Sequence, residues 1–287
     1  MSTVVLAAVQ FSRRLGDRAH NLDLAREHVR AAHGRGARLI ALPELFSTGY
    51  FPGAPISDEY FGWAEPVDGP TIRSIGELAT ELDCFVVAPI YEVDTVSRVY
   101  YNTAVLVGPD GVVGIHRKRH VGSIIGLYER HYFAPGNLQY PVYQLPFGRV
   151  GMSICYDRQF PETFRHLALR GAEIVVSVNN VGSARRLGMW RTEAQSGAGS
   201  NGIFVLTSNA TVEAEGEFFG RSMLTDPFGE LVAESDGEPG VLVAPADLGV
   251  IEAARMHYGF IRDTRLEDLG LTDESLLETR MSRLGFI

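Results

Sequence analysis

The feature that most constrains the fold of this chain is the recurrence of short, β-branched apolar runs between segments with helical periodicity. Runs of this length and composition are typical of buried strands. They predict strands over residues 4–9, 39–42, 85–90, 103–107, 150–154, 174–178, 203–208, 222–225 and 241–244. Apolar residues three and four positions apart predict helices over residues 20–32, 71–82 and 163–170. Asp110-Gly111 and Pro227-Phe228-Gly229 are turn signals of the hairpin kind.

The order of these elements predicts a layered α/β protein. The first half alternates strand and helix, whereas the second half carries several closely spaced strands. A sheet with one apolar face must be covered by another layer. No repeat, low-complexity tract or linker divides the 287 residues, so we expect a single domain over residues 1–287. Residues 266–287 are richer in charge, and we predict a C-terminal tail there that packs on a partner subunit.

Composition excludes several classes of function. The formal net charge of −9 argues against a nucleic-acid or anionic-membrane partner, since both are bound through basic surface. Cys84 and Cys155, the two cysteines, are too few for a disulfide framework. The first apolar run has strand length and no charged segment before it, unlike a signal peptide, and no later run approaches a membrane span. We therefore expect a cytoplasmic protein.

Three segments place a polar side chain where an apolar strand ends. Glu44 follows residues 39–42 in LIALPELFSTGY, Lys118 lies in GIHRKRH, and Cys155 ends a strand in SICYDR. A carboxylate directly after a buried strand is costly unless it is paired or functional. Taken singly, each has a plainer interpretation: an exposed turn carboxylate, a solvated basic face and a buried core cysteine.

Taken together, the three side chains have the chemistry of a nucleophilic hydrolase. A cysteine attacks as the thiolate, so it needs a base or a lowered pKa. Glu44 can take the thiol proton and later deliver it to a leaving amine. Lys118 can stabilise an oxyanion, helped by the backbone N–H of Tyr156, the residue after Cys155.

In this order and context, the three segments resemble the Glu-Lys-Cys signature of the nitrilase superfamily, the carbon–nitrogen hydrolases. The resemblance extends from AAVQF at residues 7–11 to HYGFIRD at residues 257–263. It implies a four-layer α-β-β-α sandwich that assembles into a homodimer or a larger homo-oligomer. It also implies hydrolysis of a non-peptide C–N bond through a thioester on Cys155, without a metal or an organic cofactor. Glu129, in LYERHYFAPG, matches a second glutamate of the family that positions the substrate or supports the lysine.

The substrate is indicated by Arg158, the third residue after the nucleophile. Its planar, charged guanidinium suits a carboxylate. The segment CYDRQFPE resembles N-carbamoyl amino acid amidohydrolases, in which an arginine at this place binds the substrate carboxylate, and GNLQYPVYQLPFGRVGMSIC is similar to β-ureidopropionases. Such a substrate would yield an amino acid, carbon dioxide and ammonia. Alternatively, Arg158 forms a salt bridge with Asp157 or Glu162. Asn179 is a further candidate for substrate binding, and residues 47–56 and 181–190 are predicted loops that shape the pocket.

Two other functions remain open at this point. The chain can be an amidase for a simple aliphatic amide or an ω-amide, with Arg158 structural. It can also be a non-catalytic binding or scaffold member of the superfamily. The presence of Glu44, Lys118, Glu129 and Cys155 favours an enzyme. His120 and His131 flank the active segments, but the mechanism already has a base in Glu44 and requires neither histidine.

Overall fold

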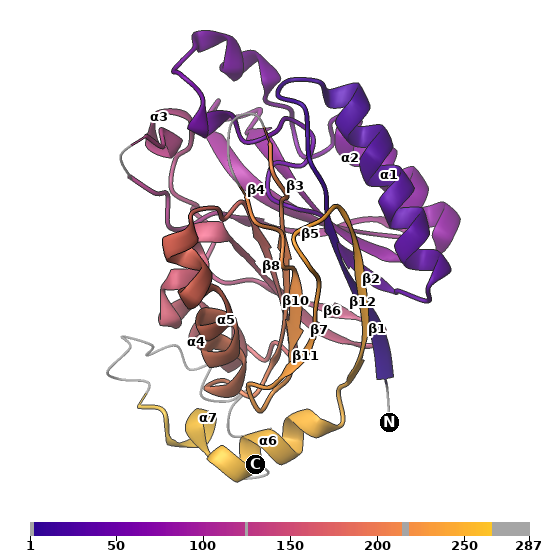
Figure 1. Ribbon diagram of the computed structural model, residues 1–287, viewed down its shortest axis with the longest axis vertical. Helices are drawn as coiled ribbons and strands as arrows, with labels where there is room; N and C mark the ends of the chain where they lie inside the picture. The colour runs from indigo at the N-terminus through magenta and orange to yellow at the C-terminus, as the bar shows by residue number, and fades with distance from the viewer. Residues whose placement is uncertain (1–2, 124–125, 214–217, 266–287) are drawn as a thin grey trace.

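The computed structural model describes residues 3–123, 126–213 and 218–265, in which two six-stranded β-sheets lie face to face between layers of helices (Figure 1). The first sheet has the order β12-β1-β2-β3-β4-β5. Its strands are β1 (Thr3–Gln10), β2 (Leu39–Ala41), β3 (Phe85–Val93), β4 (Tyr100–Gly108), β5 (Gly111–Arg117) and β12 (Gly240–Asp247). The second sheet has the order β11-β10-β9-β8-β7-β6. Its strands are β6 (Val142–Leu145), β7 (Gly148–Ile154), β8 (Ile174–Asn179), β9 (Phe204–Asn209), β10 (Met223–Thr225) and β11 (Leu231–Glu234).

Both sheets have a parallel centre and antiparallel edges. Strands β1, β2 and β3 run parallel in the first sheet, and β7, β8 and β9 run parallel in the second. The strands next to these centres, β12, β4, β10 and β6, pair antiparallel with them, and β5 and β11 pair antiparallel with β4 and β10. Parallel strands bring their carboxyl ends to one edge of a sheet, where α/β proteins commonly place their binding residues.

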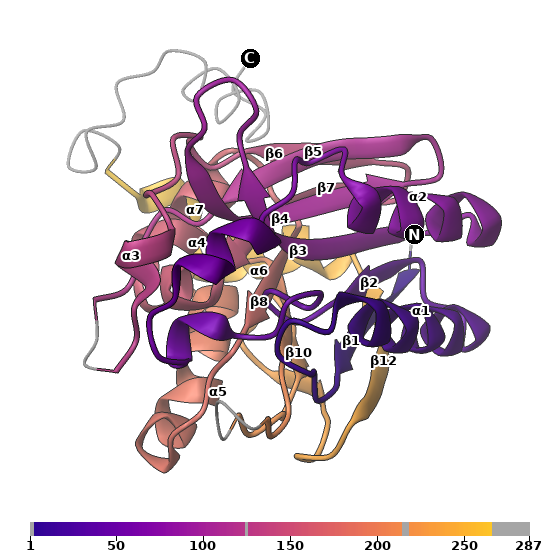
Figure 2. The ribbon, with the colours of Figure 1, turned by 90° about the horizontal axis from the view of Figure 1, so that it is seen from above.

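Helices cover the outer faces of both sheets (Figure 2). Helices α1 (Arg18–Gly34) and α2 (Pro70–Leu82) pack on the first sheet, and α4 (Pro161–Leu169) and α5 (Ala184–Gly199) pack on the second. Between the sheets lies an apolar core that includes Leu6, Val87, Met152 and Leu206. The four-layer α-β-β-α sandwich, built as one domain, is therefore confirmed for the described residues, and the bounds 1–287 of that domain stay a prediction.

Short elements complete the chain. They are the 3₁₀ helices η1 (Phe51–Gly53), η2 (Asp58–Trp63) and η3 (Cys155–Gln159), and the α-helices α3 (Glu129–Tyr132), α6 (Val250–Tyr258) and α7 (Phe260–Asp263). Among the helices of the described residues, none is both long enough and apolar enough to span a bilayer. The predicted tail at residues 266–287 lies outside the described residues.

The predicted strands and helices are all present. Among the elements that were not predicted are three strands, β5, β6 and β11, the long helix α5, and the short helices named above. The prediction of a loop over residues 181–190 is wrong, because α5 begins at Ala184. Helix α5 contains three glycines, which disfavour helix in isolation. One of them, Gly197, lets α4 approach, since a Cβ there would lie 2.8 Å from the Phe164 ring. Packing against α4 and the sheet thus outweighs the weak local preference of this segment.

Candidate active site

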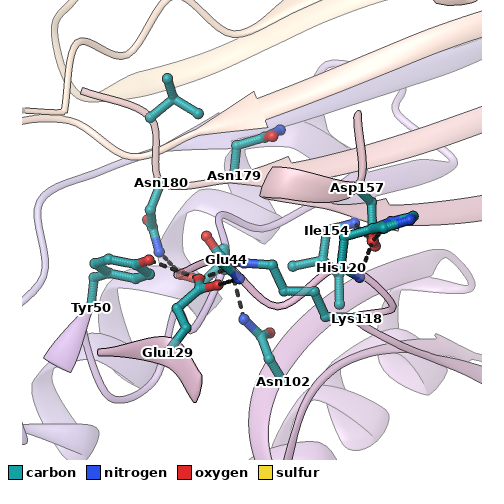
Figure 3. Close-up of polar contacts among 12 residues, drawn as sticks. Glu44, Tyr50, Asn102, Lys118, His120, Glu129, Ile154, Asp157, Asn179 and Asn180 are labelled. Carbon is teal, nitrogen blue, oxygen red and sulfur yellow. Dashed lines mark hydrogen bonds and ion pairs between the residues drawn. The ribbon is translucent and has the colours of Figure 1, made fainter. Parts of the chain in front are cut away.

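The side chains predicted to act together lie on segments that follow strands of both sheets, and Figure 3 shows three of them, Glu44, Lys118 and Glu129. Glu44 follows β2, Lys118 follows β5 directly, and Cys155 follows β7 directly. Glu129 is the first residue of α3. Glu44, Lys118 and Glu129 are each at most 2% exposed, although all three are ionisable. Charged groups buried to this degree must be paired, so their contacts determine what each can do.

The ammonium group of Lys118 lies between two carboxylates. Lys118 Nζ is 2.9 Å from Glu44 Oε1 and 2.5 Å from Glu129 Oε1. Burial disfavours the charge, but the carboxylates of Glu129 and Glu44 overcome this and hold the pKa of Lys118 well above its usual range. Lys118 is therefore a permanent cation that joins the two glutamates.

The two glutamates differ in how many of their oxygens are held. Glu129 Oε1 also accepts the hydroxyl of Tyr50 at 2.8 Å, and its Oε2 accepts the backbone N–H of Gly122 at 2.8 Å. Glu44 Oε1 accepts Asn102 Nδ2 at 2.8 Å as well as Lys118, whereas its buried Oε2 has no hydrogen-bond partner among the described residues. Burial raises the pKa of Glu44, opposed by Lys118. Glu44 Oε2 is thus the oxygen available for proton exchange.

The backbone of Glu44 is held as firmly as its side chain. Its carbonyl oxygen accepts hydrogen bonds from Arg13 Nη1 and, at 3.0 Å, from Asn180 Nδ2. Arg13 Nη2 donates to Asn180 Oδ1 at 2.7 Å, and the Arg13 guanidinium pairs with the buried carboxylate of Glu213. These contacts join the segments that follow β1, β2 and β8 at the carboxyl edges of the sheets.

Cys155 has a backbone conformation that few residues other than glycine adopt. Its φ is +45°, in the left-handed region, and it opens η3 immediately after β7. Burial raises the pKa of its thiol, the charge of Glu44 raises it further, and Lys118 and a hydrogen bond from the Asn180 backbone oppose this. The resting thiol therefore keeps its proton at neutral pH, and a thiol must lose that proton to act as a nucleophile.

Arg158 has a carboxylate partner, but neither of the two that the sequence suggested. Its Nη2 donates to Glu193 Oε2 at 2.5 Å and to the backbone oxygen of Trp190 at 2.8 Å, and its guanidinium carbon lies 4.0 Å from the centroid of the Trp190 ring. Arg158 Nη1 is buried and has no hydrogen-bond partner in the described part of the chain. Binding of a substrate carboxylate by Arg158 stays a prediction, and Nη1 is the atom that would donate to that carboxylate.

Asn179 ends β8 and uses its amide nitrogen within the sheet. Asn179 Nδ2 donates to the backbone oxygens of Ser177 at 2.9 Å and Ser208 at 3.0 Å. Its Oδ1 is buried and, within the described residues, unpartnered. Substrate binding by Asn179 stays a prediction, and Oδ1 is the atom of its side chain that could accept a hydrogen bond from a substrate.

A second polar cluster lies directly beside the cysteine. The carboxylate of Asp157 accepts hydrogen bonds from the rings of His116 and His120, and all three side chains lie next to the segments that carry Lys118 and Cys155. In residues 3–123, 126–213 and 218–265, no group of three or more His, Cys, Asp or Glu side chains is arranged to hold a metal ion.

The family model described as carbon–nitrogen hydrolase matches residues 5–256. This chain belongs to the carbon–nitrogen hydrolase family. Among its relatives is an N-carbamoylputrescine amidase from Solanum lycopersicum, which is 36% identical over 280 residues that cover 91% of this chain and 92% of that protein. A citrullinase from Francisella tularensis subsp. tularensis is 32% identical over 93% of this chain and 97% of that protein.

Solved structures of carbon–nitrogen hydrolases share the same fold. The crystal structure of a carbon–nitrogen hydrolase from Helicobacter pylori G27 superposes with a TM-score of 0.86 at 26% identity, covering 92% of this chain and 96% of that one. An amidase from Nesterenkonia sp. AN1 superposes with a TM-score of 0.79 at 25% identity over 93% of this chain and 95% of that one. That amidase structure, of a mutant, shows covalent addition of the acetamide moiety of fluoroacetamide at its active-site cysteine.

Sequence reasoning did not single out four residues of this carbon–nitrogen hydrolase that hold the cluster: Arg13, Tyr50, Asn102 and Asn180. One of them carried a signal in the sequence, because Asn102 is an amide in a largely apolar segment, and the structure shows it wholly buried in β4. A buried amide must find a partner, and that partner is Glu44. Arg13, Tyr50 and Asn180 could be assigned only once the neighbours of β1, β2 and β8 were known.

Proposed function

We propose that this carbon–nitrogen hydrolase cleaves the terminal C–N bond of an N-carbamoyl compound, with Cys155 as nucleophile and Glu44 as general base. The proposal is carried by one observation: of the two carboxylates bound to Lys118, only Glu44 keeps an oxygen without a hydrogen-bond partner among the described residues. The Nesterenkonia amidase, modified at its active-site cysteine, supports a cysteine nucleophile. The other cysteine, Cys84, is buried in the core between α1, α2 and the first sheet.

The first half of the reaction forms a covalent intermediate. The proton of Cys155 passes to Glu44 Oε2 as the sulfur bonds to the ureido carbon, whose oxygen becomes an oxyanion. Lys118 Nζ and the Tyr156 N–H stabilise that oxyanion. The bond to the terminal nitrogen then breaks, Glu44 returns the proton to that nitrogen, and ammonia leaves. Cys155 is left joined through sulfur to the carbonyl carbon, which still carries the remaining nitrogen of the substrate.

The second half consumes one water molecule. Glu44 takes a proton from the water as its oxygen attacks the thioester carbon, and the same oxyanion contacts are used again. The carbon–sulfur bond breaks, the sulfur recovers a proton from Glu44, and a carbamic acid is released. This acid decomposes to carbon dioxide and the free amine. Glu129, whose two oxygens are both held, keeps Lys118 in place instead of exchanging protons.

The charges around Arg158 favour a substrate with one carboxylate. Glu193 bridges two arginines, since its Oε2 accepts from Arg158 and its Oε1 pairs with Arg186. The three side chains together carry one positive charge in excess, and the buried Arg158 Nη1 lacks an acceptor among the described residues. A single carboxylate would balance this charge and supply the acceptor. N-carbamoyl amino acids have this group.

A carbamoyl amine is the second candidate, and the observation in its favour is the name of the Solanum relative, an N-carbamoylputrescine amidase. Arg158 would then have a structural part through Glu193 and Trp190. It also lines a cavity of about 440 Å³ between η3, α4 and α5, and the side chains around that cavity do not include Glu44, Lys118 or Cys155.

Ammonia release from a substrate panel tests the proposal and separates the two candidates. The panel contains N-carbamoyl-β-alanine, both enantiomers of an N-carbamoyl α-amino acid, N-carbamoylputrescine and a plain aliphatic amide, with Cys155→Ala as blank. We expect turnover of the ureas and none with Cys155→Ala. For a carboxylated urea, Arg158→Gln should raise KM and leave kcat within a few-fold. An unchanged KM would exclude carboxylate binding by Arg158, and turnover confined to the aliphatic amide would exclude the N-carbamoyl substrate class.

A further inference from the structure

We propose that Asp157 is a positioning residue that fixes Cys155 relative to Lys118 by binding both of their segments at once. The proposal rests on the proposed function, since the relative position of these two residues matters only if both act on the substrate. It assigns Asp157 no contact with the substrate.

The carboxylate of Asp157 is wholly buried and accepts four hydrogen bonds. Its Oδ1 accepts the backbone N–H of His120 at 2.8 Å and His120 Nδ1 at 2.9 Å. Its Oδ2 accepts His116 Nε2 at 3.0 Å and the backbone N–H of Ile154 at 3.1 Å. Each oxygen therefore binds the segment that carries Lys118, and one of them also binds the end of the strand that carries Cys155.

These contacts connect the two sheets at the site of the chemistry. His116 belongs to β5 of the first sheet and His120 follows it, so the two histidines flank Lys118 at a distance of two residues on each side. Ile154 is the last residue of β7 in the second sheet and precedes Cys155. Lys118 and Cys155 come from different sheets, and the single carboxylate of Asp157 joins their backbones.

The contact with Ile154 also spans the unfavourable backbone at Cys155. A non-glycine residue with a positive φ persists only where its surroundings hold it there. The Asp157 side chain reaches back over the +45° residue to the N–H of Ile154 and closes the turn. His120 stacks on Phe160, with ring centroids 3.8 Å apart, and Phe160 is the C-cap residue directly after η3. Both ends of η3 are thereby tied to the lysine segment.

Asp157 is suited to hold its neighbours and not to exchange protons. A carboxylate has about four acceptor sites, and four N–H groups occupy those of Asp157. Burial alone would raise its pKa, but the hydrogen bonds from His116 and His120 prevail and hold the pKa of Asp157 well below its usual range. The proton exchange is thus left to Glu44, and the part of Asp157 is geometric.

Asp157→Asn is the direct test, because asparagine keeps the size of aspartate but presents an NH₂ group to one pair of these donors. We expect kcat to fall by about 10-fold to about 100-fold, as for a displacement of reacting groups by about 1 Å, while KM changes by less than about threefold. Glu65→Gln is the matched control. Glu65 is also a buried carboxylate that accepts a backbone N–H, from Thr71 at 3.0 Å, but it lies outside the site. This control should keep the wild-type kcat.

His120 provides a second pair of variants in case Asp157→Asn does not fold. The side chain of His120→Asn can place an N–H near the position of Nδ1, whereas His120→Ala cannot. We expect His120→Ala to lower kcat several-fold and His120→Asn to restore most of it at an unchanged KM. Equal kcat values in the two variants would overturn the part of this inference that concerns His120.

Alkylation of Cys155 by iodoacetamide tests the positioning without any substrate. Because Lys118 lowers the pKa of the Cys155 thiol, moving the two apart in Asp157→Asn should shift the alkylation profile to higher pH, and Glu65→Gln should not shift it. Wild-type alkylation and kcat in folded Asp157→Asn would overturn the inference, as would an equal loss in Glu65→Gln. If the wild-type protein turns over none of the ureas but the alkylation profile of Asp157→Asn is still shifted to higher pH, the proposed function is rejected and the positioning role of Asp157 is kept.

Discussion

Cys155 keeps its proton in the resting protein, because burial and the charge of Glu44 raise the pKa of its thiol more than Lys118 lowers it. A low thiol pKa is one way to activate a cysteine, and an adjacent base is the other. The contacts in this protein favour activation by an adjacent base. Glu44 has a raised pKa, and its buried Oε2 has no hydrogen-bond partner among the described residues. At the scale of the residue, deprotonation and attack are therefore expected to occur together.

This state of the thiol predicts the pH dependence of its alkylation. The iodoacetamide rate of the free protein should rise with pH and should still be rising above about pH 9, because a raised pKa moves formation of the thiolate to higher pH. Intact mass spectrometry would follow the reaction, with Cys155→Ala as control. Cys84 should interfere little, since it is wholly buried and burial raises its pKa to about 11. A rate that is flat from about pH 6 to about pH 9 would indicate a thiolate at rest.

Glu44→Gln should remove the base and leave the cluster intact. Glutamine Oε1 can still accept from Lys118 and Asn102, so the fold should be kept, but kcat should fall by about 10² to about 10⁴. In the wild type, Glu44 must be ionised and its pKa is raised, so kcat/KM should decline on acidification at a pH above the ordinary carboxyl value of 4.5. Steady-state kinetics across pH would check both. A variant that keeps more than about a third of the wild-type kcat would contradict the role of Glu44.

How far the site could be predicted depended on the kind of contact each residue makes. Glu44, Lys118, Glu129 and Cys155 could be named because each side chain suits a chemical role and stands in a recognisable local context. Tyr50, Asn102 and Arg13 act by holding those residues, and their partners are distant in sequence. Such pairs become visible only when the order of strands in the sheet is known. The same holds for the Arg158 partner, which is Glu193 in α5, a helix that was not predicted.

At the scale of the element, the end of β5 sets where Lys118 emerges from the first sheet. Gly136 packs directly on this point: its N–H donates to the backbone oxygen of Lys118 at 2.7 Å. A Cβ on Gly136 would lie 2.1 Å from the backbone oxygen of Arg117 and 3.0 Å from that of Lys118. Backbone atoms cannot yield as a flexible side chain can, so the lysine segment has space for glycine alone at this position.

Gly136→Ala should therefore displace the end of β5, lowering both the free energy of unfolding and kcat. Gly188→Ala is the matched control, because a Cβ on Gly188, which lies in α5, would have no neighbouring atom within 4 Å among the described residues. In a helix, alanine is favoured over glycine by roughly 0.5–1 kcal/mol, so this control should raise Tm slightly at unchanged kcat. Urea unfolding and kinetics would be measured for both. Wild-type stability and kcat in Gly136→Ala would contradict the packing described at β5.

The strands themselves were more predictable than their partners. Buried runs such as β3 and β8 are continuous and apolar, so composition indicates them directly. The edge strand β5 was missed because Val112 and Val113 are both exposed in a segment that also contains two glycines, which removes the usual alternation. Lys118 was nonetheless identified, since its chemistry and order along the chain did not depend on the strand before it.

At the scale of the whole molecule, the two sheets depend on the core between them for stability. The sheets contact each other through β1 and β9, where Ser208 Oγ donates to the backbone oxygen of Val9 at 2.7 Å. Because Glu44 and Lys118 follow strands of one sheet and Cys155 follows a strand of the other, the site exists only when both sheets are packed together. The homodimer or larger assembly implied by the family stays a prediction at this scale.

Leu206→Ala tests the core between the sheets. Leu206 lies in β9 and is 1% exposed, so the substitution should leave a cavity and lower the free energy of unfolding by about 2–5 kcal/mol. Val96→Ala, at a position 93% exposed, should change it by less than about 0.5 kcal/mol. Urea unfolding monitored by circular dichroism would compare the two. Similar stabilities for both variants would contradict the sandwich core.

Trapping the covalent intermediate would test most directly whether Cys155 attacks a ureido carbonyl and whether ammonia leaves first. The protein would be mixed with the urea it hydrolyses fastest, quenched with acid during the first turnover and analysed by intact and peptide mass spectrometry. We predict an adduct on the peptide that contains Cys155, heavier by the mass of the substrate less ammonia, and absent from Cys155→Ala. An adduct that carries only a carbamoyl group, or one on another residue, would contradict the account.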